Sequence, residues 1–123
     1  MKRILVTGAN GFIGKSTYPL LHNLGYEIHC VSTKEMSNSN NLFWHKANLL
    51  NLTEIRALFS QIKPNYLLHL AWITTPGKYW TSLENFLWVQ SGLEILNSFK
   101  NNGCEKVVIA GTCAEYDWSY GIC

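Results

Sequence analysis

Long apolar runs are the first thing that this sequence lacks. Near its start the apolar stretch Ile4–Val6 is broken at once by Thr7-Gly8, so it is too short for a secretory leader. No later segment approaches the ~20 consecutive apolar residues that span a bilayer. The sequence therefore predicts a protein without a membrane anchor or membrane partner, and we expect it in the cytoplasm.

The chain also has little excess of charge of either sign. Ten Lys and Arg stand against eight Asp and Glu, which gives a formal net charge of +2, and no basic cluster exceeds Lys2-Arg3. A nucleic-acid-binding surface needs a basic patch that neutralises phosphates. We therefore expect no nucleic-acid partner, and small molecules are the expected ligands.

The cysteines lack the spacing of a metal site. The four cysteines, Cys30, Cys104, Cys113 and Cys123, form no Cys-x-x-Cys pair, and no pair of histidines stands near them at ligand intervals. The sequence thus predicts buried thiols and no metal centre.

What the chain does have is an alternation of strand and helix patterns. With 123 residues, 47% of them hydrophobic, it is long enough for one domain with a real core. Short β-rich runs predict strands at Lys2–Val6, Glu27–Ser32, Phe43–His45, Tyr66–Ala71 and Lys106–Ala110. Helical spacing predicts helices at Phe12–Leu24, Thr53–Ile62 and Ser82–Phe99, the first kinked or irregular at Pro19 and stopped by Gly25. Such alternation is typical of the α/β class, here a doubly wound parallel sheet of about five strands with ligand chemistry at its carboxyl edge.

Three glycines stand at the junction of the first predicted strand and helix. In this position Gly8 permits a tight turn, Gly11 lets backbone amides approach a pyrophosphate, and Gly14 lets the helix pack close to the sheet. This spacing predicts a dinucleotide site whose contacts come from the residues around the turn, namely Gly8, Asn10, Gly11, Phe12 and Ile13. A glycine turn that holds no ligand is the alternative.

The same stretch also fits a permissive phosphate-binding P-loop. In that alignment Lys15 would contact the phosphates of a nucleoside triphosphate and Ser16 would bind magnesium. However, Ala9 replaces the first glycine of the P-loop, and no later predicted strand ends in an acid that could hold the metal. The dinucleotide hypothesis is therefore preferred, with the P-loop kept as a competitor.

Two further motifs turn this pattern into a family resemblance. His69-Leu70-Ala71-Trp72 is similar to a His-x-Ala-Ala segment after the fourth strand, and residues 110–116 are similar to a Ser/Thr-rich stretch that ends in Val-Tyr-Gly. Together with Thr7-Gly8-x-x-Gly11-Phe12-Ile13-Gly14, they make the chain resemble the NAD-dependent epimerase/dehydratase family, the extended short-chain dehydrogenases/reductases. The resemblance covers residues 2 to about 116, and it implies a Rossmann fold and oxidoreductase chemistry on a nucleotide-linked sugar.

The resemblance also implies roles for individual residues. It places Leu70, Ala71 and Trp72 against the cofactor, and it places Thr112 as the catalytic hydroxyl that donates a hydrogen bond to the reacting oxygen of the sugar. A hydroxyl that satisfies backbone at a strand end is the alternative for Thr112, and a core histidine is the alternative to a cofactor-facing His69.

Other cofactor contacts follow less directly from the same resemblance. Asn48-Leu49 stands where the family has an acid followed by an apolar residue against adenine, although an ordinary loop asparagine also fits. After the second strand an acid that binds a ribose 2′-hydroxyl is expected, but the sequence runs Ser32-Thr33-Lys34 before Glu35. Hydroxyls followed by a lysine suit a 2′-phosphate, so the cofactor is NADP or NAD, with NADP favoured.

The Tyr-x-x-x-Lys pair, which supplies the general acid or base in this family, is absent from residues 1–123. In the family this tyrosine follows the Thr112 position by some two dozen residues, so we expect it, and the substrate domain, beyond the end of this sequence. The 123 residues would then be an incomplete NAD(P)-binding domain that does not turn over a sugar nucleotide by itself. A non-catalytic dinucleotide-sensing module is the alternative. An incomplete sheet also predicts an exposed apolar edge and, through it, a homo-oligomer.

Overall fold

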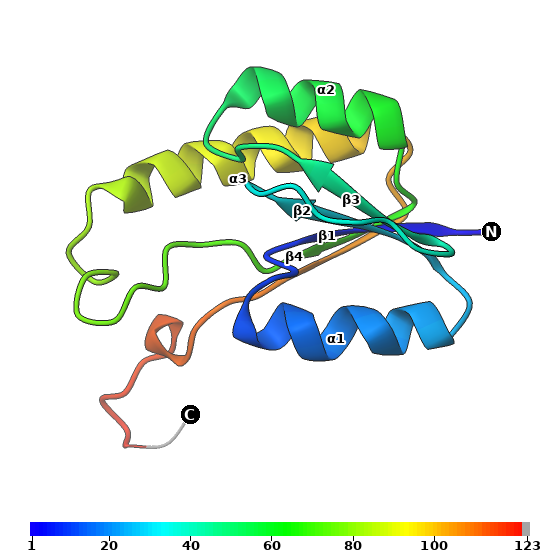
Figure 1. The fold of residues 1–123 in the computed structure, drawn as a ribbon. Coiled ribbons are helices and arrows are strands. Elements are labelled where there is room, and N and C mark those ends of the chain that lie inside the picture. The colour runs from blue at the N-terminus through cyan, green and yellow to red at the C-terminus, as the bar shows by residue number, and fades with distance from the viewer. Residues whose placement is uncertain (122–123) are drawn as a thin grey trace.

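A five-stranded parallel sheet forms the centre of the molecule in the computed structural model, which describes residues 1–121 (Figure 1). The strands are β1 (Arg3–Thr7), β2 (Glu27–Ser32), β3 (Leu42–Lys46), β4 (Tyr66–His69) and β5 (Lys106–Ile109). Their order across the sheet is β3-β2-β1-β4-β5, and every neighbouring pair is parallel. The predicted doubly wound α/β sheet, the Rossmann arrangement, is confirmed.

Helices cover both faces of this sheet, as the alternation predicts. The helix α1 (Phe12–Asn23) lies on one face, and α2 (Leu52–Ile62) and α3 (Glu84–Asn101) lie together on the other (Figure 1). A short 3-10 turn, η1 (Cys113–Glu115), follows β5. The helix α1 continues through Pro19 without a break, and it stops before Gly25, whose φ of +86° is left-handed.

Two apolar cores hold these layers together, one on each face of the sheet. Leu5, on β1, packs with Phe59 of α2 and Phe99 of α3, whereas its neighbour Val6 faces Ile28 and the α1 side. Side chains of a strand alternate between the two faces of its sheet. The central strand is therefore buried on both faces, as its continuous apolar sequence predicts.

The order of the strands also decides where a ligand can bind. From β1 the chain crosses outward to β2 and β3, and it then returns to the opposite side of β1 to form β4 and β5. At this reversal the ends of β1 and β4 lie together, with Thr7 opposite His69 in the register. In open parallel sheets such a reversal leaves a crevice beyond the carboxyl ends of the strands.

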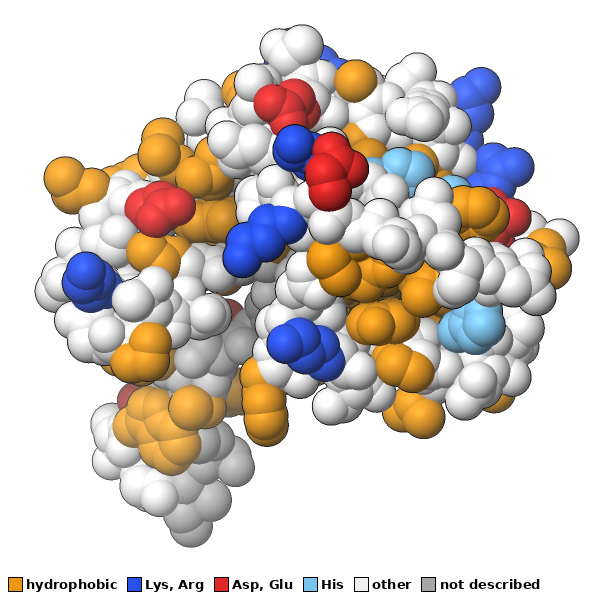
Figure 2. All heavy atoms as spheres, in the orientation of Figure 1, with side chains coloured by type: hydrophobic (Ala, Val, Ile, Leu, Met, Phe, Trp, Pro, Cys, Tyr) orange, Lys and Arg blue, Asp and Glu red, His pale blue; other side chains and the backbone are white. Residues whose placement is uncertain are grey.

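The edge formed by β5 carries little cover among the described residues. All four residues of β5 are exposed, and Val108 retains 54% of its accessible surface. Figure 2 shows apolar side chains on the surface over the start of α3 and over the segment that follows β5. The chain thus presents an uncovered apolar surface at this edge.

The thiols differ from the prediction. Cys30 is buried on β2, and burial raises its pKa to about 12. Cys104 and Cys113, which we expected to be buried, are exposed because they flank the uncovered strand β5. Cys123 lies outside the described residues. No helix in residues 1–121 is both long and apolar enough to span a membrane.

Three polar side chains on β2 and β3, those of Glu27, His29 and His45, form a hydrogen-bonded row on the face of the sheet that α2 covers. His29 Nε2 lies 2.8 Å from Glu27 Oε1, and His29 Nδ1 lies 2.8 Å from His45 Nε2, with the two imidazole rings stacked. Burial lowers the pKa of both histidines, and burial also lowers the pKa of His69 on β4. Folding therefore favours the neutral form of these three imidazoles.

These imidazoles predict a loss of stability on mild acidification. In the unfolded chain each one regains its ordinary pKa near 6.5 and binds a proton that the folded chain does not bind. The free energy of unfolding, measured in urea, should be fully developed above pH 6.5 and should fall as the pH drops below it. The hydrogen bond from His29 lowers the pKa of Glu27. The stability that Glu27 contributes is therefore lost only as the pH falls below 4.5, the ordinary pKa of this carboxyl group.

The variant His45→Gln separates this effect from general acid unfolding. It removes His45, a half-buried imidazole whose pKa is lowered in the folded protein, so the stability of the variant should fall less steeply than that of the wild type between pH 7 and pH 5. An equal loss in the two proteins would contradict the assignment.

Candidate functional site

The junction of β1 and α1 leaves no room for a side chain at Gly8, which lies in the turn, or at Gly14, which lies at the start of α1. Gly8 has a φ of +69°, and a Cβ there would lie 2.8 Å from the backbone nitrogen of Ala71. A Cβ on Gly14 would lie 2.3 Å from the carbonyl oxygen of Gly8. The turn therefore packs directly on the backbone that follows β4, and α1 packs directly on the turn.

A buried threonine holds the ends of β1 and β4 together. Thr7 Oγ1 accepts hydrogen bonds from the backbone N–H groups of Leu70, at 3.1 Å, and Ala71, at 3.2 Å. With its acceptor positions filled, the hydroxyl donates its proton to His69 Nδ1 at 2.6 Å. His69 is therefore the Nε2–H tautomer, and this buried N–H has no hydrogen-bond partner within residues 1–121.

The first turn of α1 provides unpaired backbone donors at the same place. Its N-cap is Gly11, so no side chain caps the first amides of the helix, and its first turn contains no acid. Amides at a helix start point outward, and the helix dipole favours negative charge there. The start of α1 is therefore suited to an anionic group such as a diphosphate.

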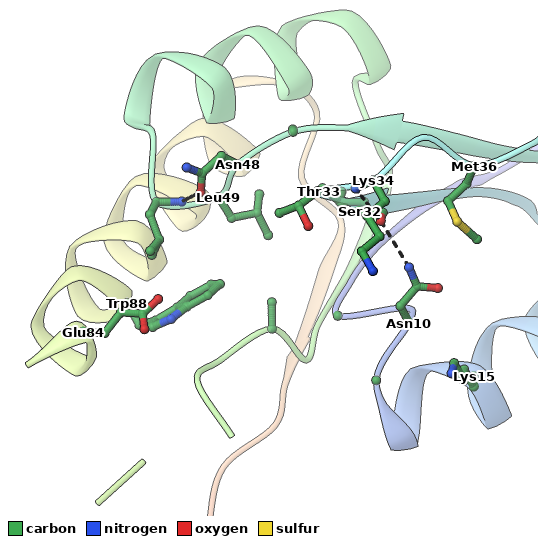
Figure 3. A pocket seen from close by; sticks show the side chains of 16 residues that line it. Asn10, Lys15, Ser32, Thr33, Lys34, Met36, Asn48, Leu49, Glu84 and Trp88 are labelled. Carbon is green, nitrogen blue, oxygen red and sulfur yellow. Dashed lines mark hydrogen bonds between the residues drawn. The ribbon is translucent and has the colours of Figure 1, made fainter. Parts of the chain in front are cut away.

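A cavity of about 630 Å³ opens in front of this turn, at the carboxyl ends of the strands (Figure 3). Its walls come from the loops that follow β1, β2, β3 and β4 and from the first turns of α3. Nine of the residues predicted to bind a cofactor line it, namely Gly8, Asn10, Gly11, Ser32, Thr33, Lys34, Asn48, Leu49 and Ala71. The structure thus brings together four separate stretches of the sequence.

Four other predicted contacts lie outside the lining of this cavity. Phe12 and Ile13 are exposed on α1, so they could reach an anion only through their backbone amides, and Leu70 packs against the core on the α1 side. Trp72 is 42% exposed, and its indole N–H donates to Asn85 Oδ1 at 2.7 Å. Their roles as cofactor contacts stay predictions.

Thr112 also lies away from the cavity. It is the N-cap of η1, where its hydroxyl accepts from the backbone N–H of Ala114 and its own N–H donates to Glu115. Within residues 1–121 the hydroxyl therefore has a structural partner, which is the alternative that the sequence leaves open. Its catalytic role stays a prediction.

Charge is distributed unevenly around the cavity. Lys15 and Lys34 line it, and neither amine forms a salt bridge with any residue from 1 to 121. On the same side Asn10 Nδ2 donates to Ser32 Oγ at 3.1 Å, which joins the glycine turn to the end of β2 (Figure 3). Glu35, which follows Lys34, does not line the cavity and lies 3.3 Å from Lys46.

The opposite wall includes residues that the sequence analysis did not assign to the site. Glu84 and Trp88 line the cavity from one face of α3, where they stand four positions apart. Trp88 was expected in the core or at a former interface, and its ring does pack against the core. Lys15, Val31, Met36, Ala47 and Leu50 complete the set. In the sequence, only their spacing of four positions on a predicted helix indicated that Glu84 and Trp88 share one helix face.

The connection between β1 and α1 is short for a P-loop, which stays an alternative. Only residues 8–11 connect β1 to α1, and Gly14 and Lys15 already lie inside the helix. A P-loop needs a longer connection to wrap around a phosphate. In the part of the chain that the structure describes, no three His, Cys, Asp or Glu side chains gather where they could hold a metal ion.

Comparisons with known proteins agree with this geometry. The sequence model of the NAD dependent epimerase/dehydratase family matches residues 4–122. The chain is 29% identical to GDP-L-colitose synthase of Yersinia pseudotuberculosis, with 93% of this chain and 34% of that protein covered. It is 25% identical to UDP-glucose 4-epimerase 1 of Oryza sativa subsp. japonica, with 96% and 38% covered. The chain thus spans little more than a third of these relatives.

A solved structure matches over a similar share. It is MoeE5 in complex with UDP-glucuronic acid and NAD, which superposes with a TM-score of 0.73 at 26% identity and covers 89% of this chain and 36% of that one.

The packing of α1 on the turn predicts opposite effects for two glycine-to-alanine substitutions. In Gly14→Ala the new methyl group would meet the Gly8 carbonyl oxygen, so the thermal midpoint should fall and any ligand affinity should fall with it. Gly92→Ala is the matched control, because a Cβ at this position of α3 meets nothing within 4 Å. It should stabilise the fold by about 0.5–1 kcal/mol through helix propensity. Thermal unfolding followed by circular dichroism measures both, and equal shifts would contradict the packing argument.

Proposed function

The chain belongs to the NAD-dependent epimerase/dehydratase family, and we propose that its residues form the part of such an enzyme that binds the dinucleotide. One observation carries this proposal. The start of α1, whose amides no side chain caps, follows a close-packed glycine turn and faces a cavity of about 630 Å³ at the reversal of the strand order. Such a turn binds a diphosphate through backbone amides.

Other residues that line the cavity suit the ribose and the adenine of the dinucleotide's adenylate half. Ser32, Thr33 and Lys34 stand at the end of β2, where the ribose would lie, and Asn48 and Leu49 stand at the end of β3, where adenine would lie. When bound, the cofactor would supply hydride transfer at its nicotinamide. This chain would hold and orient it.

We propose NADP in preference to NAD. The solved relative described above is a complex with NAD, which supports at least that dinucleotide for the family. In this chain the amines of Lys15 and Lys34 are without a salt-bridge partner within residues 1–121, and no acid follows β2 at the cavity. Two cations without a salt-bridge partner favour a ligand that carries the additional 2′-phosphate.

Calorimetric titration with NADPH and NADH tests both the site and this preference. NADPH should bind more tightly, and Lys34→Ala should weaken NADPH by about tenfold or more, because a charge-assisted hydrogen bond is lost. NADH affinity should change little. Lys46→Ala is the matched control, since Lys46 pairs with Glu35 away from the cavity. Binding of NADH at least ten times tighter than NADPH would reject NADP, and magnesium-dependent ATP binding with neither dinucleotide bound would reject the site.

The names of the relatives support a sugar nucleotide as the substrate of the parent enzyme. One is a GDP-L-colitose synthase and another a UDP-glucose 4-epimerase. We propose epimerisation, dehydration or reduction of a nucleotide-linked sugar, with Thr112 as the residue that steadies the reacting oxygen. We expect the residues that select the sugar outside residues 1–123. The expected location of the protein stays the cytoplasm.

Residues 1–123 should bind the cofactor without turnover. They contain no Tyr-x-x-x-Lys pair, and a threonine hydroxyl without an activated phenol stabilises charge but does not move the proton. Steady oxidation of NADPH by the isolated chain would contradict this.

The uncovered edge supports self-association of this chain. Within residues 1–121 the strand β5 has no neighbouring strand on one side, and Val107, Val108 and Ile109 are 37%, 54% and 49% exposed. An apolar edge strand of this kind pairs readily with another chain. We therefore propose a homo-oligomer formed through β5.

Light scattering with increasing protein concentration tests this proposal. The wild type should increase in mean mass, and Val108→Lys should remain a monomer over the same range, because a charge on the edge opposes pairing. Ser37→Lys, which adds the same charge to an exposed loop, should behave like the wild type. A monomeric wild type at every concentration would contradict the proposal.

A further inference from the structure

Glu84 is the one acid among the described residues that line the cavity. It stands half-buried at the start of α3, and Figure 3 shows its side chain reaching from the helix toward the cavity, beside the ring of Trp88. Its carboxylate forms no salt bridge within residues 1–121. The first turn of α3 does not use this carboxylate as a cap, since the backbone N–H of Glu84 donates to Ser82 Oγ at 3.2 Å. The acid is therefore available to a ligand.

The packing of α3 on the loop after β3 decides how far Glu84 stands from that loop. Ser91 donates its hydroxyl to the carbonyl oxygen of Leu49, and Glu84 precedes Ser91 by seven positions, on the same face of the helix. Seven residues of an α-helix span about 10 Å. Glu84 therefore stands about two turns beyond the contact of α3 with Leu49, and Trp88 lies between the two.

This wall of the cavity is apolar along most of its length and negative at its outer end. Leu49 and the ring of Trp88 provide the apolar part, and Glu84 provides the charge. Figure 3 shows all three on one side of the cavity, across from Lys34. A flat base that lies along Leu49 and Trp88 would thus present its outer edge to a hydrogen-bond acceptor.

Adenine has a donor at the edge that such a wall would meet. Its 6-amino group donates hydrogen bonds. This group lies at the opposite end of the ring system from the nitrogen that carries the ribose. With the ribose beside Ser32 and Lys34 at the end of β2, the base would extend across the cavity toward α3. A carboxylate only accepts hydrogen bonds, so Glu84 suits an amino group and repels an oxygen in the same place.

The polar groups of the loop after β3 are engaged with one another. Asn48 Oδ1 accepts from the backbone N–H of Leu50 at 3.0 Å, and the N–H of Asn48 donates to Glu54 Oε2 at 2.7 Å. The other oxygen of Glu54 accepts from Asn51 Nδ2 at 3.2 Å. These bonds hold the loop in shape, and they leave Glu84 as the carboxylate that the cavity offers to a ligand.

We propose that the Glu84 carboxylate accepts a hydrogen bond from the 6-amino group of the adenine in the bound dinucleotide. Glu84 is then a specificity-determining residue, which favours adenine over a base that carries an oxygen at this position. The proposal rests on the proposed function, because it assumes that the dinucleotide occupies this cavity with its diphosphate at the start of α1.

Calorimetric titration of the wild type with two ligands tests the contact. One ligand is ADP-ribose, which contains the adenylate half without nicotinamide. The other is its counterpart with hypoxanthine, in which an oxygen replaces the 6-amino group. ADP-ribose should bind about ten times more tightly, because hypoxanthine loses the charge-assisted hydrogen bond and turns an oxygen toward the carboxylate.

Two variants assign this preference to Glu84. In Glu84→Ala and in Glu84→Gln the two ligands should bind within a factor of about two of each other, since alanine has no acceptor and the amide of glutamine can both accept and donate. Glu35→Gln is the matched control. It removes the same charge from a residue that pairs with Lys46 and does not line the cavity, so it should keep the wild-type preference.

The outcomes separate this inference from the proposed function. If the wild type binds the two ligands equally, or if both Glu84 variants keep the preference for ADP-ribose, the inference is overturned and the proposed function stands. If the wild type binds neither ADP-ribose nor NADPH, the proposed function fails and the inference fails with it. The ratio of the two affinities is the decisive quantity, because a purely structural role of Glu84 would weaken both ligands alike.

Discussion

The structure depends on one steric constraint, the contact between the first turn and two stretches of backbone. Gly8 lies against the backbone of Ala71, and Gly14 lies against the carbonyl oxygen of Gly8, both at distances that exclude a Cβ. This contact sets the position of α1 on the sheet and brings the end of β4 beside the end of β1. The hydroxyl of Thr7 fixes the same junction with hydrogen bonds to two backbone amides and to His69.

The cavity that results has two unlike walls. Backbone amides, Asn10 and two lysines stand on one side, and the loop after β3 and the aromatic ring of Trp88 stand on the other. A dinucleotide likewise joins a charged diphosphate, which suits the first wall, to a flat base, which suits the second. The match of the two walls to the two chemical halves is a stronger argument than the glycine spacing alone, because it draws on four separate loops.

Stability and solvent exposure are also divided across the sheet. The strands β1 and β2 are buried on both faces, whereas β5 is exposed along its length. The site lies at the carboxyl ends of the buried strands, so the residues that would hold the diphosphate follow directly on the core of the molecule. The apolar surface near β5 lies away from them, which separates association of the chain from binding of its ligand.

The order of the elements and the place of the site could be predicted from the sequence, because both depend on local patterns. Apolar runs of strand length, helical spacing and a glycine turn are properties of neighbouring residues, and the alternation of strands and helices then restricts the topology. The run Ile4–Val6 and the glycines at 8, 11 and 14 were sufficient to place a glycine turn at the end of β1. The strand β4 ends at His69, earlier than predicted, since the chain turns there toward the cavity.

Only the tertiary structure decided which aromatic residue lines the cavity. Trp72 follows the motif that the family resemblance points to, yet it lies outside the cavity lining, whereas Trp88 lines the cavity. The difference arises from the rotation and position of α3, which are set by its packing against α2 and the sheet through residues such as Ile95 and Phe99. That packing joins residues far apart in the chain, and no pattern of neighbouring residues encodes it.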